Sequence, residues 1–157
     1  NWKVMDGIAQ STSWLTNGNK TSDNWMITPR ISLGAEPYLT WEAVTYDNNY
    51  RDGYEVLIST AGDDIANFTS ILFSVDAEES EWTNHLVDLR AYANQNVYLA
   101  FHHNSTDKYV LAIDNILVYH LEGFDISLDG YQLNKYMKPG VEENLILSST
   151  SQPISYN

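Results

Sequence analysis

Short runs of β-forming residues, separated by turn-forming residues, recur along most of this chain. Residues 38–46 (YLTWEAVTY) and 54–60 (YEVLIST) are clear examples. In the first run, Leu39, Trp41 and Ala43 fall on one face of a strand. Segments such as DNNYRDG and TAGDD supply the turns, and no segment keeps an apolar period of 3.6 residues. The pattern predicts an all-β fold, an antiparallel β-sandwich of Greek-key or jelly-roll type.

Charge and composition argue against several classes of function. The 157 residues include 8 Lys and Arg against 21 Asp and Glu, for a net charge of -13. Nucleic acids and anionic membranes need clustered basic residues, so neither is an expected partner. The chain has no Cys, which excludes disulfides and thiol catalysis. It also lacks a bilayer-spanning apolar run and the GxSxG, HExxH and phosphate-loop motifs, so we expect a non-catalytic protein.

A domain boundary is predicted near Glu122 and Gly123, after the long run KYVLAIDNILVYHL. Residues 1–122 would form the sandwich domain. Residues 123–157 contain few large apolar side chains, too few for a core of their own. They would either dock on the sandwich or begin a second β-rich module that is truncated here, and we favour the second alternative. The chain starts NWKV, without Met, which we interpret as a segment of a longer precursor.

The residue that most needs explaining is Asp114, at the centre of VLAIDNILVY (residues 110–119). Both faces of this predicted strand are apolar, as in a strand that is covered on both sides. An unpaired carboxylate buried there would cost several kcal/mol or take up a proton. Calcium would stabilise it, because calcium binds carboxylates and backbone oxygens in a flexible shell. The alternatives are a bulge or strand-end Asp bonded to backbone N–H groups, and a salt bridge.

Three other residues are candidate ligands for the same ion. Asp6 comes first, because the opening and closing strands of a jelly roll lie side by side. Asp23 and Asn24, in SDNW, come next, although an Asx turn would also account for them. His102 and His103 would point to opposite faces of a strand, so they cannot chelate one ion together. We interpret both histidines as strand-end polar residues.

Aromatic residues near polar loops predict a binding surface. Tyr46, Tyr50 and Tyr54 flank the loop DNNYRDG, and Trp82 follows the acidic run EESE. Such rings can stack on sugars while nearby Asp and Asn side chains bond the hydroxyls. The alternative is that aromatic residues pack the core. We assign mainly to the core the four remaining tryptophans, Trp2, Trp14, Trp25 and Trp41.

Four phrases occur in a familiar order: SDNWMITPRISL (residues 22–33), DGYEVLIST (52–60), HLVDLRAYANQNVYLAFHH (85–103) and LAIDNILVY (111–119). So ordered, they resemble the cleaved-adhesin domain of gingipains and related haemagglutinins. That family overlaps the "choice-of-anchor J" domains and is similar in fold to MAM domains. The resemblance covers residues 2–119. It implies a jelly roll of the MAM-like or galactose-binding-like type, secreted or displayed on the cell surface, with structural calcium and an adhesive role.

The resemblance has two further implications. Residues after Gly123 look like the start of the Ig-like module that often follows such domains. Family members commonly carry a DxDGDG-type loop followed by Trp, whereas this chain has only Met5-Asp6-Gly7 with Trp14 further on. This departure puts a calcium site on that loop in doubt.

We therefore predict a non-catalytic extracellular adhesion module of a larger bacterial protein, stabilised by calcium. Its partners would be a glycan, or a host glycoprotein or matrix protein, together with neighbouring domains of the same chain. The alternative is an accessory β-domain that stabilises or positions the catalytic domain of a secreted protease or glycoside hydrolase.

Overall fold

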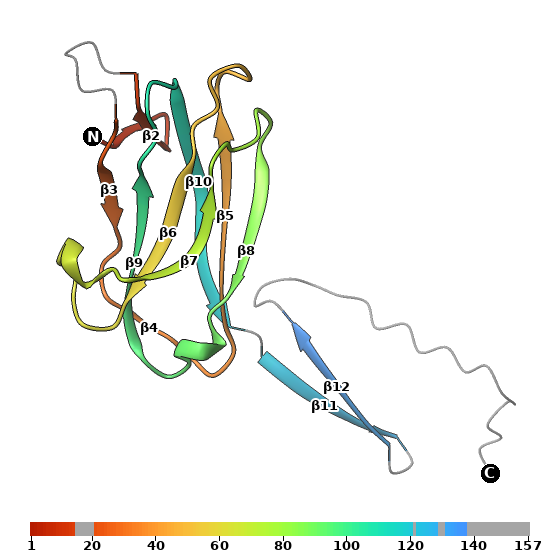
Figure 1. Ribbon diagram of the computed structural model, residues 1–157. Coiled ribbons are helices and arrows are strands. Elements are labelled where there is room, and N and C mark those ends of the chain that lie inside the picture. Colours follow the sequence, from red (N-terminus) through yellow and green to blue (C-terminus); the bar gives the residue numbers. More distant parts are fainter. Residues whose placement is uncertain (15–20, 121, 129–130, 138–157) are drawn as a thin grey trace, which may run out of the picture.

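The computed structural model describes residues 1–14, 21–120, 122–128 and 131–137 of the chain. The sandwich strands are β1 Lys3–Met5, β2 Ile8–Thr12, β3 Asn24–Ile27, β4 Ile31–Ser32, β5 Pro37–Thr45, β6 Tyr54–Ser59, β7 Ser70–Val75, β8 Thr83–Asp88, β9 Asn96–His103 and β10 Val110–His120. They form two antiparallel sheets (Figure 1). One has the order β1-β2-β10-β5-β8, and the other β3-β9-β6-β7, with β4 beside β9. The predicted all-β antiparallel sandwich is confirmed.

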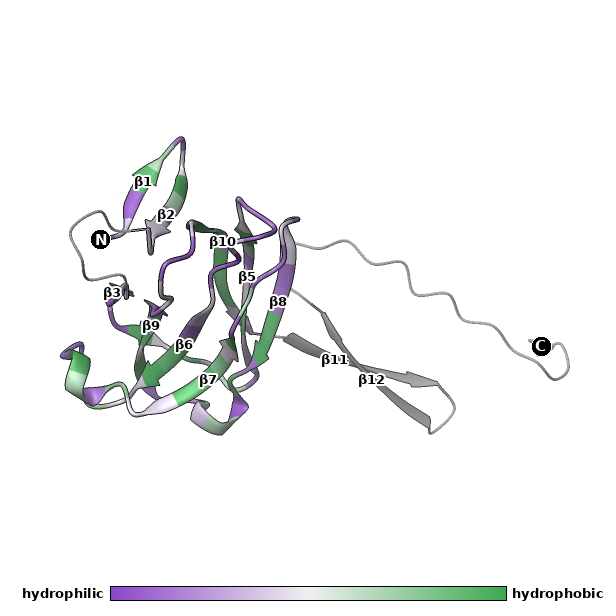
Figure 2. Ribbon diagram, turned by 45° about the horizontal axis from the view of Figure 1, so that its top comes forward, coloured by the Kyte–Doolittle hydropathy of each residue, from purple (hydrophilic) through white to green (hydrophobic). Residues whose placement is uncertain are grey.

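The main core lies between the two sheets, because alternate side chains of facing strands point inward. Leu39, Trp41 and Ala43 of β5 are buried, as the alternation of that strand predicts. Val56 of β6 and Phe101 of β9 meet them from the other sheet. Figure 2 shows hydrophobic stretches on the strands, whereas many connecting loops are hydrophilic. The alternating pattern therefore places the core correctly.

A second, smaller cluster covers the outer side of β6 and β9. Leu57 and Ala100 are buried there beneath Phe68, which follows the short helix η1 (Ile65–Asn67). Trp25 packs against the same cluster. Because a loop covers this part of the sheet, residues that alternation assigns to the outside of β6 are nevertheless buried.

Strand β10 changes course at a β-bulge between Asp114 and Leu117. Asn115 takes a positive φ of 51°, which Asn tolerates better than most residues. The extra residue reverses which side chains face the core. Leu111 and Ile113 point inward before the bulge, and after it Val118 packs on the core while Leu117 is 42% exposed. The prediction that both faces of this strand are buried is therefore wrong for the second half of the strand.

Beyond the sandwich, β11 (Glu122–Leu128) and β12 (Tyr131–Met137) pair as a separate two-stranded antiparallel sheet. The remaining parts of the predicted second module, residues 129–130 and 138–157, lie outside the described residues. The assignment of residues 123–157 to a following module stays a prediction. Within the described ranges, no helix is long and apolar enough to cross a membrane.

Candidate functional site

The structure corrects the prediction for Asp114. Its side chain is partly exposed at the bulge, where one carboxylate oxygen accepts a hydrogen bond from the backbone N–H of Asn115 at 2.8 Å. The Asn115 amide in turn donates to the Glu42 carboxylate at 2.7 Å. Asp114 therefore fits the alternative given above, in which an Asp at a bulge bonds a backbone N–H group. The expected burial is wrong because the bulge turns this part of β10 toward solvent.

The other three candidate calcium ligands do not form a common site with Asp114. Strands β2 and β10 do lie side by side, with Ala9 opposite Ile113, but Asp6 is exposed in the turn between β1 and β2. Asp23 accepts hydrogen bonds from Trp25 Nε1 at 2.7 Å and faces His102 Nε2 at 3.0 Å, and these partners lower the pKa of Asp23.

The fourth candidate, Asn24, uses its side-chain N–H group to bond Ser11. Among the described residues, no group of three or more His, Cys, Asp or Glu side chains could hold a metal ion. The four predicted residues thus do not fit a calcium site as a set, and bound calcium stays a prediction.

Asp52, in the loop before β6, has a completely buried carboxylate. One of its oxygens accepts a hydrogen bond from the Ser13 hydroxyl and lies 2.9 Å from His103 Nε2. The other accepts the backbone N–H of Tyr109 at 3.1 Å. Polar groups of the protein itself therefore satisfy this carboxylate, which is the role that the sequence had assigned to calcium at Asp114.

The contacts continue from His103 through the interior. Its Nδ1 atom lies 2.7 Å from the Ser11 hydroxyl, which accepts from the Asn24 amide at 2.9 Å. Every contact is satisfied when Ser11 donates to Nδ1 and His103 carries its proton on Nε2, facing Asp52. We call Ser11, Ser13, Asn24, Asp52 and His103 the Asp52 network. It joins β2 of one sheet to β3 and β9 of the other.

The order Ser11–His103–Asp52 has the connectivity of a nucleophilic triad. A triad, however, needs a serine that a substrate can reach. Ser11 is 2% exposed, and the other two side chains are completely buried. Neither of the two described cavities is lined by any of the three. The arrangement therefore connects the sheets and does not form a reaction centre.

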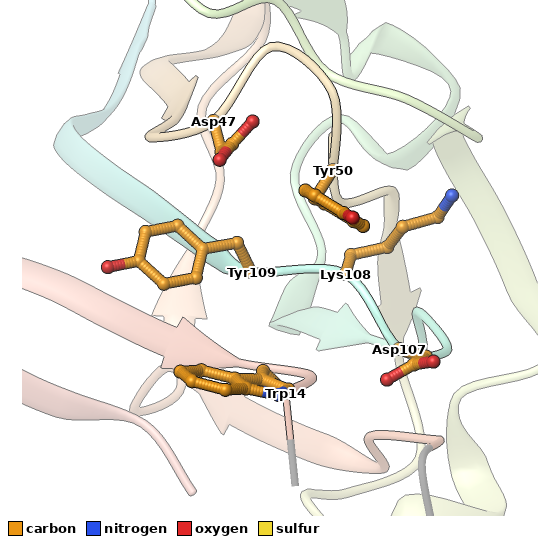
Figure 3. A pocket seen from close by; sticks show the side chains of 6 residues that line it. All are labelled: Trp14, Asp47, Tyr50, Asp107, Lys108 and Tyr109. Carbon is orange, nitrogen blue, oxygen red and sulfur yellow. The ribbon is translucent and has the colours of Figure 1, made fainter.

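A pocket of about 390 Å³ opens at the loop end of the sandwich, next to this network (Figure 3). We call it the loop-end pocket. Three segments supply its walls: the residue pair after β2, the loop between β5 and β6, and the loop before β10. The lining residues are Trp14, Asp47, Tyr50, Asp107, Lys108 and Tyr109. The volume lies within the range of about 300–1,000 Å³ that is usual for small-molecule sites.

The Asp52 network fixes the walls of this pocket from the core side. Ser13 accepts the backbone N–H of Lys108 at 3.0 Å, and Asp52 accepts that of Tyr109. The Thr12 hydroxyl donates to the Tyr109 carbonyl at 2.6 Å. The loop before β10 is thus tied to the end of β2 and to the loop before β6. The backbone that carries Lys108 and Tyr109 is therefore held in place by the protein itself.

Three of the six residues that line the pocket are exposed aromatic residues. Trp14, Tyr50 and Tyr109 are 60%, 55% and 39% exposed. The rings of Trp14 and Tyr109 lie 6.3 Å apart at an angle of 48°, so they form two sides of an open corner. Asp47 is oriented by an Asx turn, because one of its oxygens accepts the Asn49 N–H at 2.8 Å.

Of the four predicted binding residues, Tyr50 lies in the loop-end pocket. Tyr46 and Trp82 are 46% and 42% exposed but do not line it. Tyr54 is completely buried, so its prediction as a surface residue is wrong. Its hydroxyl donates to Glu78 at 3.0 Å and accepts from Trp41, and burial raises the pKa of Tyr54.

Sequence reasoning also missed part of the pocket. Trp14 was assigned to the core, yet it is the most exposed of the aromatic residues that line the pocket. Its position in the mostly polar stretch STSWLTNGN was a usable signal for exposure. Tyr109 and Asp107 carried no such signal, because only the pairing of β10 with β2 brings them beside Trp14.

The fold is a β-sandwich with a pocket between the loops at one end, and known proteins are similar to this chain in sequence and in fold. The sequence model of the Cleaved Adhesin Domain family matches residues 3–118. This chain therefore belongs to the cleaved adhesin domain family, and the resemblance seen in the sequence is confirmed.

Similar proteins come from Porphyromonas gingivalis. Hemagglutinin A is 32% identical over 138 residues, which is 72% of this chain and 5% of that protein. Gingipain R1 is 31% identical over 63% of this chain and 7% of that protein. The chain thus spans a small fraction of the curated relatives that it matches.

Solved structures of isolated domains give the same result. The K1 cleaved adhesin domain of Lys-gingipain has a TM-score of 0.61 and 28% identity, covering 72% of this chain and 73% of that domain. The K3 domain has a TM-score of 0.60 at 24% identity, covering 71% of this chain and 72% of that domain. The latter shows likeness of fold alone.

Proposed function

We propose that this chain is an extracellular adhesion module that binds a glycan through the loop-end pocket. The observation that carries the proposal is the combination of three exposed aromatic rings with two carboxylates around one pocket. An aromatic face stacks on the apolar C–H face of a sugar, while carboxylate oxygens accept hydrogen bonds from its hydroxyls. The Asp52 network keeps the walls in place, which lowers the entropy cost of binding.

Family membership supports the adhesive part of the proposal. The matching family is an adhesin family, and one relative is named a hemagglutinin. These names belong to the relatives, and the geometry of this chain adds the candidate contact surface. The high negative charge is compatible with a glycan and is unfavourable for nucleic acid.

The test is a glycan array, followed by calorimetry on the wild-type protein and its variants. Trp14→Ala and Tyr50→Ala should each weaken binding about fivefold, since one stacked ring contributes on the order of 1 kcal/mol. Trp82→Ala is the matched control, because Trp82 is 42% exposed and does not line the pocket. Equal affinity of all three variants and the wild type would refute the assignment of the pocket.

A second candidate function is an accessory domain of a secreted hydrolase. Two of the relatives, Gingipain R1 and Lys-gingipain, carry the names of gingipains, and this chain matches a small part of each. In that case the module would stabilise or position a neighbouring catalytic domain of the same chain. Removal of the module would then lower the melting temperature of that neighbour, and the isolated module would bind no glycan on the array.

A further inference from the structure

We infer that the loop-end pocket selects uncharged sugars and rejects glycans that carry a carboxylate or sulfate group. This inference rests on the proposed glycan binding and adds the chemical class of the ligand. The argument depends on the signs and positions of the charges that surround the three aromatic rings.

The charged side chains that line the pocket are Asp47, Asp107 and Lys108. Figure 3 shows the two carboxylates on different sides of the pocket, with Asp47 near Tyr109 and Tyr50, and Asp107 near Lys108. The Lys108 side chain extends away from the corner between Trp14 and Tyr109. A ligand that stacks in this corner therefore has carboxylates as its charged neighbours on two sides.

A buried carboxylate lies behind the pocket wall. The Tyr109 N–H donates to the carboxylate of Asp52, which is completely buried and lies 2.9 Å from His103 Nε2. Buried charges are screened less by water and salt than exposed ones. The whole chain, with a net charge of -13, adds a long-range field of the same sign.

Hydrogen-bond chemistry points to the same selectivity. An ionised carboxylate only accepts hydrogen bonds, and a sugar hydroxyl can donate one. One oxygen of Asp47 is already used by the Asn49 N–H, which fixes the direction of the remaining acceptor positions. A ligand carboxylate or sulfate placed there would offer only acceptors and would add like-charge repulsion. Uncharged hydroxyl groups therefore match the site, and acidic groups do not.

The experiment uses an array in which each neutral glycan stands beside its sialylated and sulfated derivatives. Affinities are measured for the wild type and Trp14→Ala at low and at high salt. Neutral glycans should bind at least tenfold more tightly than their acidic derivatives. The difference should shrink at high salt, because screening reduces the repulsion.

Two variants with opposite expected effects test the charges directly. Asp47→Asn removes a negative charge and should raise the ratio of acidic to neutral binding several-fold. Lys108→Gln removes a basic side chain from the lining of the loop-end pocket and should lower the ratio of acidic to neutral binding. Asp63→Asn is the control, because Asp63 is exposed in the loop between β6 and β7 and should leave the ratio unchanged.

The outcomes separate this inference from the proposed function. Acidic glycans that bind as tightly as neutral ones, with binding weakened in Trp14→Ala, would overturn the inference and leave glycan binding in place. An array without binding, or a Trp14→Ala variant with full affinity, would overturn both. An unchanged ratio in Asp47→Asn and Lys108→Gln would also overturn the inference.

Discussion

Asp52 and Glu78 are both buried carboxylates that face a histidine, yet the protein holds them in different ways. Asp52 faces His103, and hydroxyl and backbone groups satisfy the remaining positions of its carboxylate. Its partners come from the residue that follows β2, from β9 and from the loop before β10. Asp52 and His103 therefore take part in a chain of well-formed hydrogen bonds, and this chain connects the two sheets.

Glu78 lies instead among aromatic rings in the loop between β7 and β8. It accepts a hydrogen bond from the Tyr54 hydroxyl, and its second oxygen accepts the Glu79 N–H at 2.7 Å. His85 Nε2 lies 2.8 Å from Glu78, but the contact lacks the angles of a hydrogen bond. His85 also stacks on Trp41, with ring centroids 5.0 Å apart. The Glu78–His85 pair therefore holds the loop between β7 and β8 against the core by close packing, and not by a hydrogen bond between the two side chains.

The difference shows where this fold tolerates a buried charge. Both carboxylates lie in loops that flank strands, where backbone N–H groups and side chains from several elements converge. A backbone hydrogen bond from Glu78 N to Asp52 O, 2.8 Å long, links the two regions. In the middle of a strand the ladder already uses the backbone groups, so Asp114 needed a bulge and solvent.

The largest loss of stability is expected from a substitution of Asp52, which faces His103. Asp52→Ala leaves His103, the Ser13 hydroxyl and the Tyr109 N–H buried without their partner, so it should lower the free energy of unfolding by about 3–5 kcal/mol. Urea denaturation measures this change. Asp52→Asn should lose less, because its amide oxygen still accepts a hydrogen bond. Asp63→Ala serves as an exposed control, and a loss under about 1 kcal/mol for Asp52→Ala would contradict the role of the network.

A smaller effect is expected at the aromatic region. Tyr54→Phe removes the hydroxyl between Trp41 and Glu78, which should cost about 1–3 kcal/mol at neutral pH, because both groups are then buried without that partner. Denaturant unfolding of the two proteins at pH 7 measures the difference. A variant as stable as the wild type would mean that the Glu78 region does not depend on this hydroxyl.

The same residue predicts a pH dependence. Burial raises the pKa of Tyr54 above the ordinary 10.0, so the folded state keeps a proton that the unfolded state releases above that pH. Stability from this group is complete below about pH 10 and falls above it by about 1.4 kcal/mol per pH unit. In Tyr54→Phe, the free energy of unfolding should lack this contribution to its fall between pH 10 and 11. Equal alkaline slopes would show that Tyr54 does not titrate as its burial requires.

The smallest effect is expected at Asp114. The side chain is partly exposed and bonds a backbone N–H in the bulge, so Asp114→Ala should change stability by less than about 1 kcal/mol. Any stabilisation by added calcium over EDTA should be the same in variant and wild type. A calcium-dependent rise in melting temperature that disappears in Asp114→Ala would restore the metal site predicted from the sequence.

The sequence by itself determined the fold class and most of the core. Leu39, Trp41 and Ala43 were assigned correctly because side-chain direction in a strand alternates with a period of two, which is a local property. The family could also be identified, since its motifs are contiguous phrases in a fixed order.

The tertiary structure alone decided which polar residues are buried, and it decided the exposure of Trp14 and the burial of Tyr54. Ser13 and Lys108 are 95 positions apart and Ser11 and His103 are 92 apart, so no local pattern shows that they meet. The exposure of Trp14 and the burial of Tyr54 follow from which loops meet at the end of the sandwich. A charged or hydroxyl group can be buried only where partners satisfy it, and strand pairing across the whole chain supplies those partners.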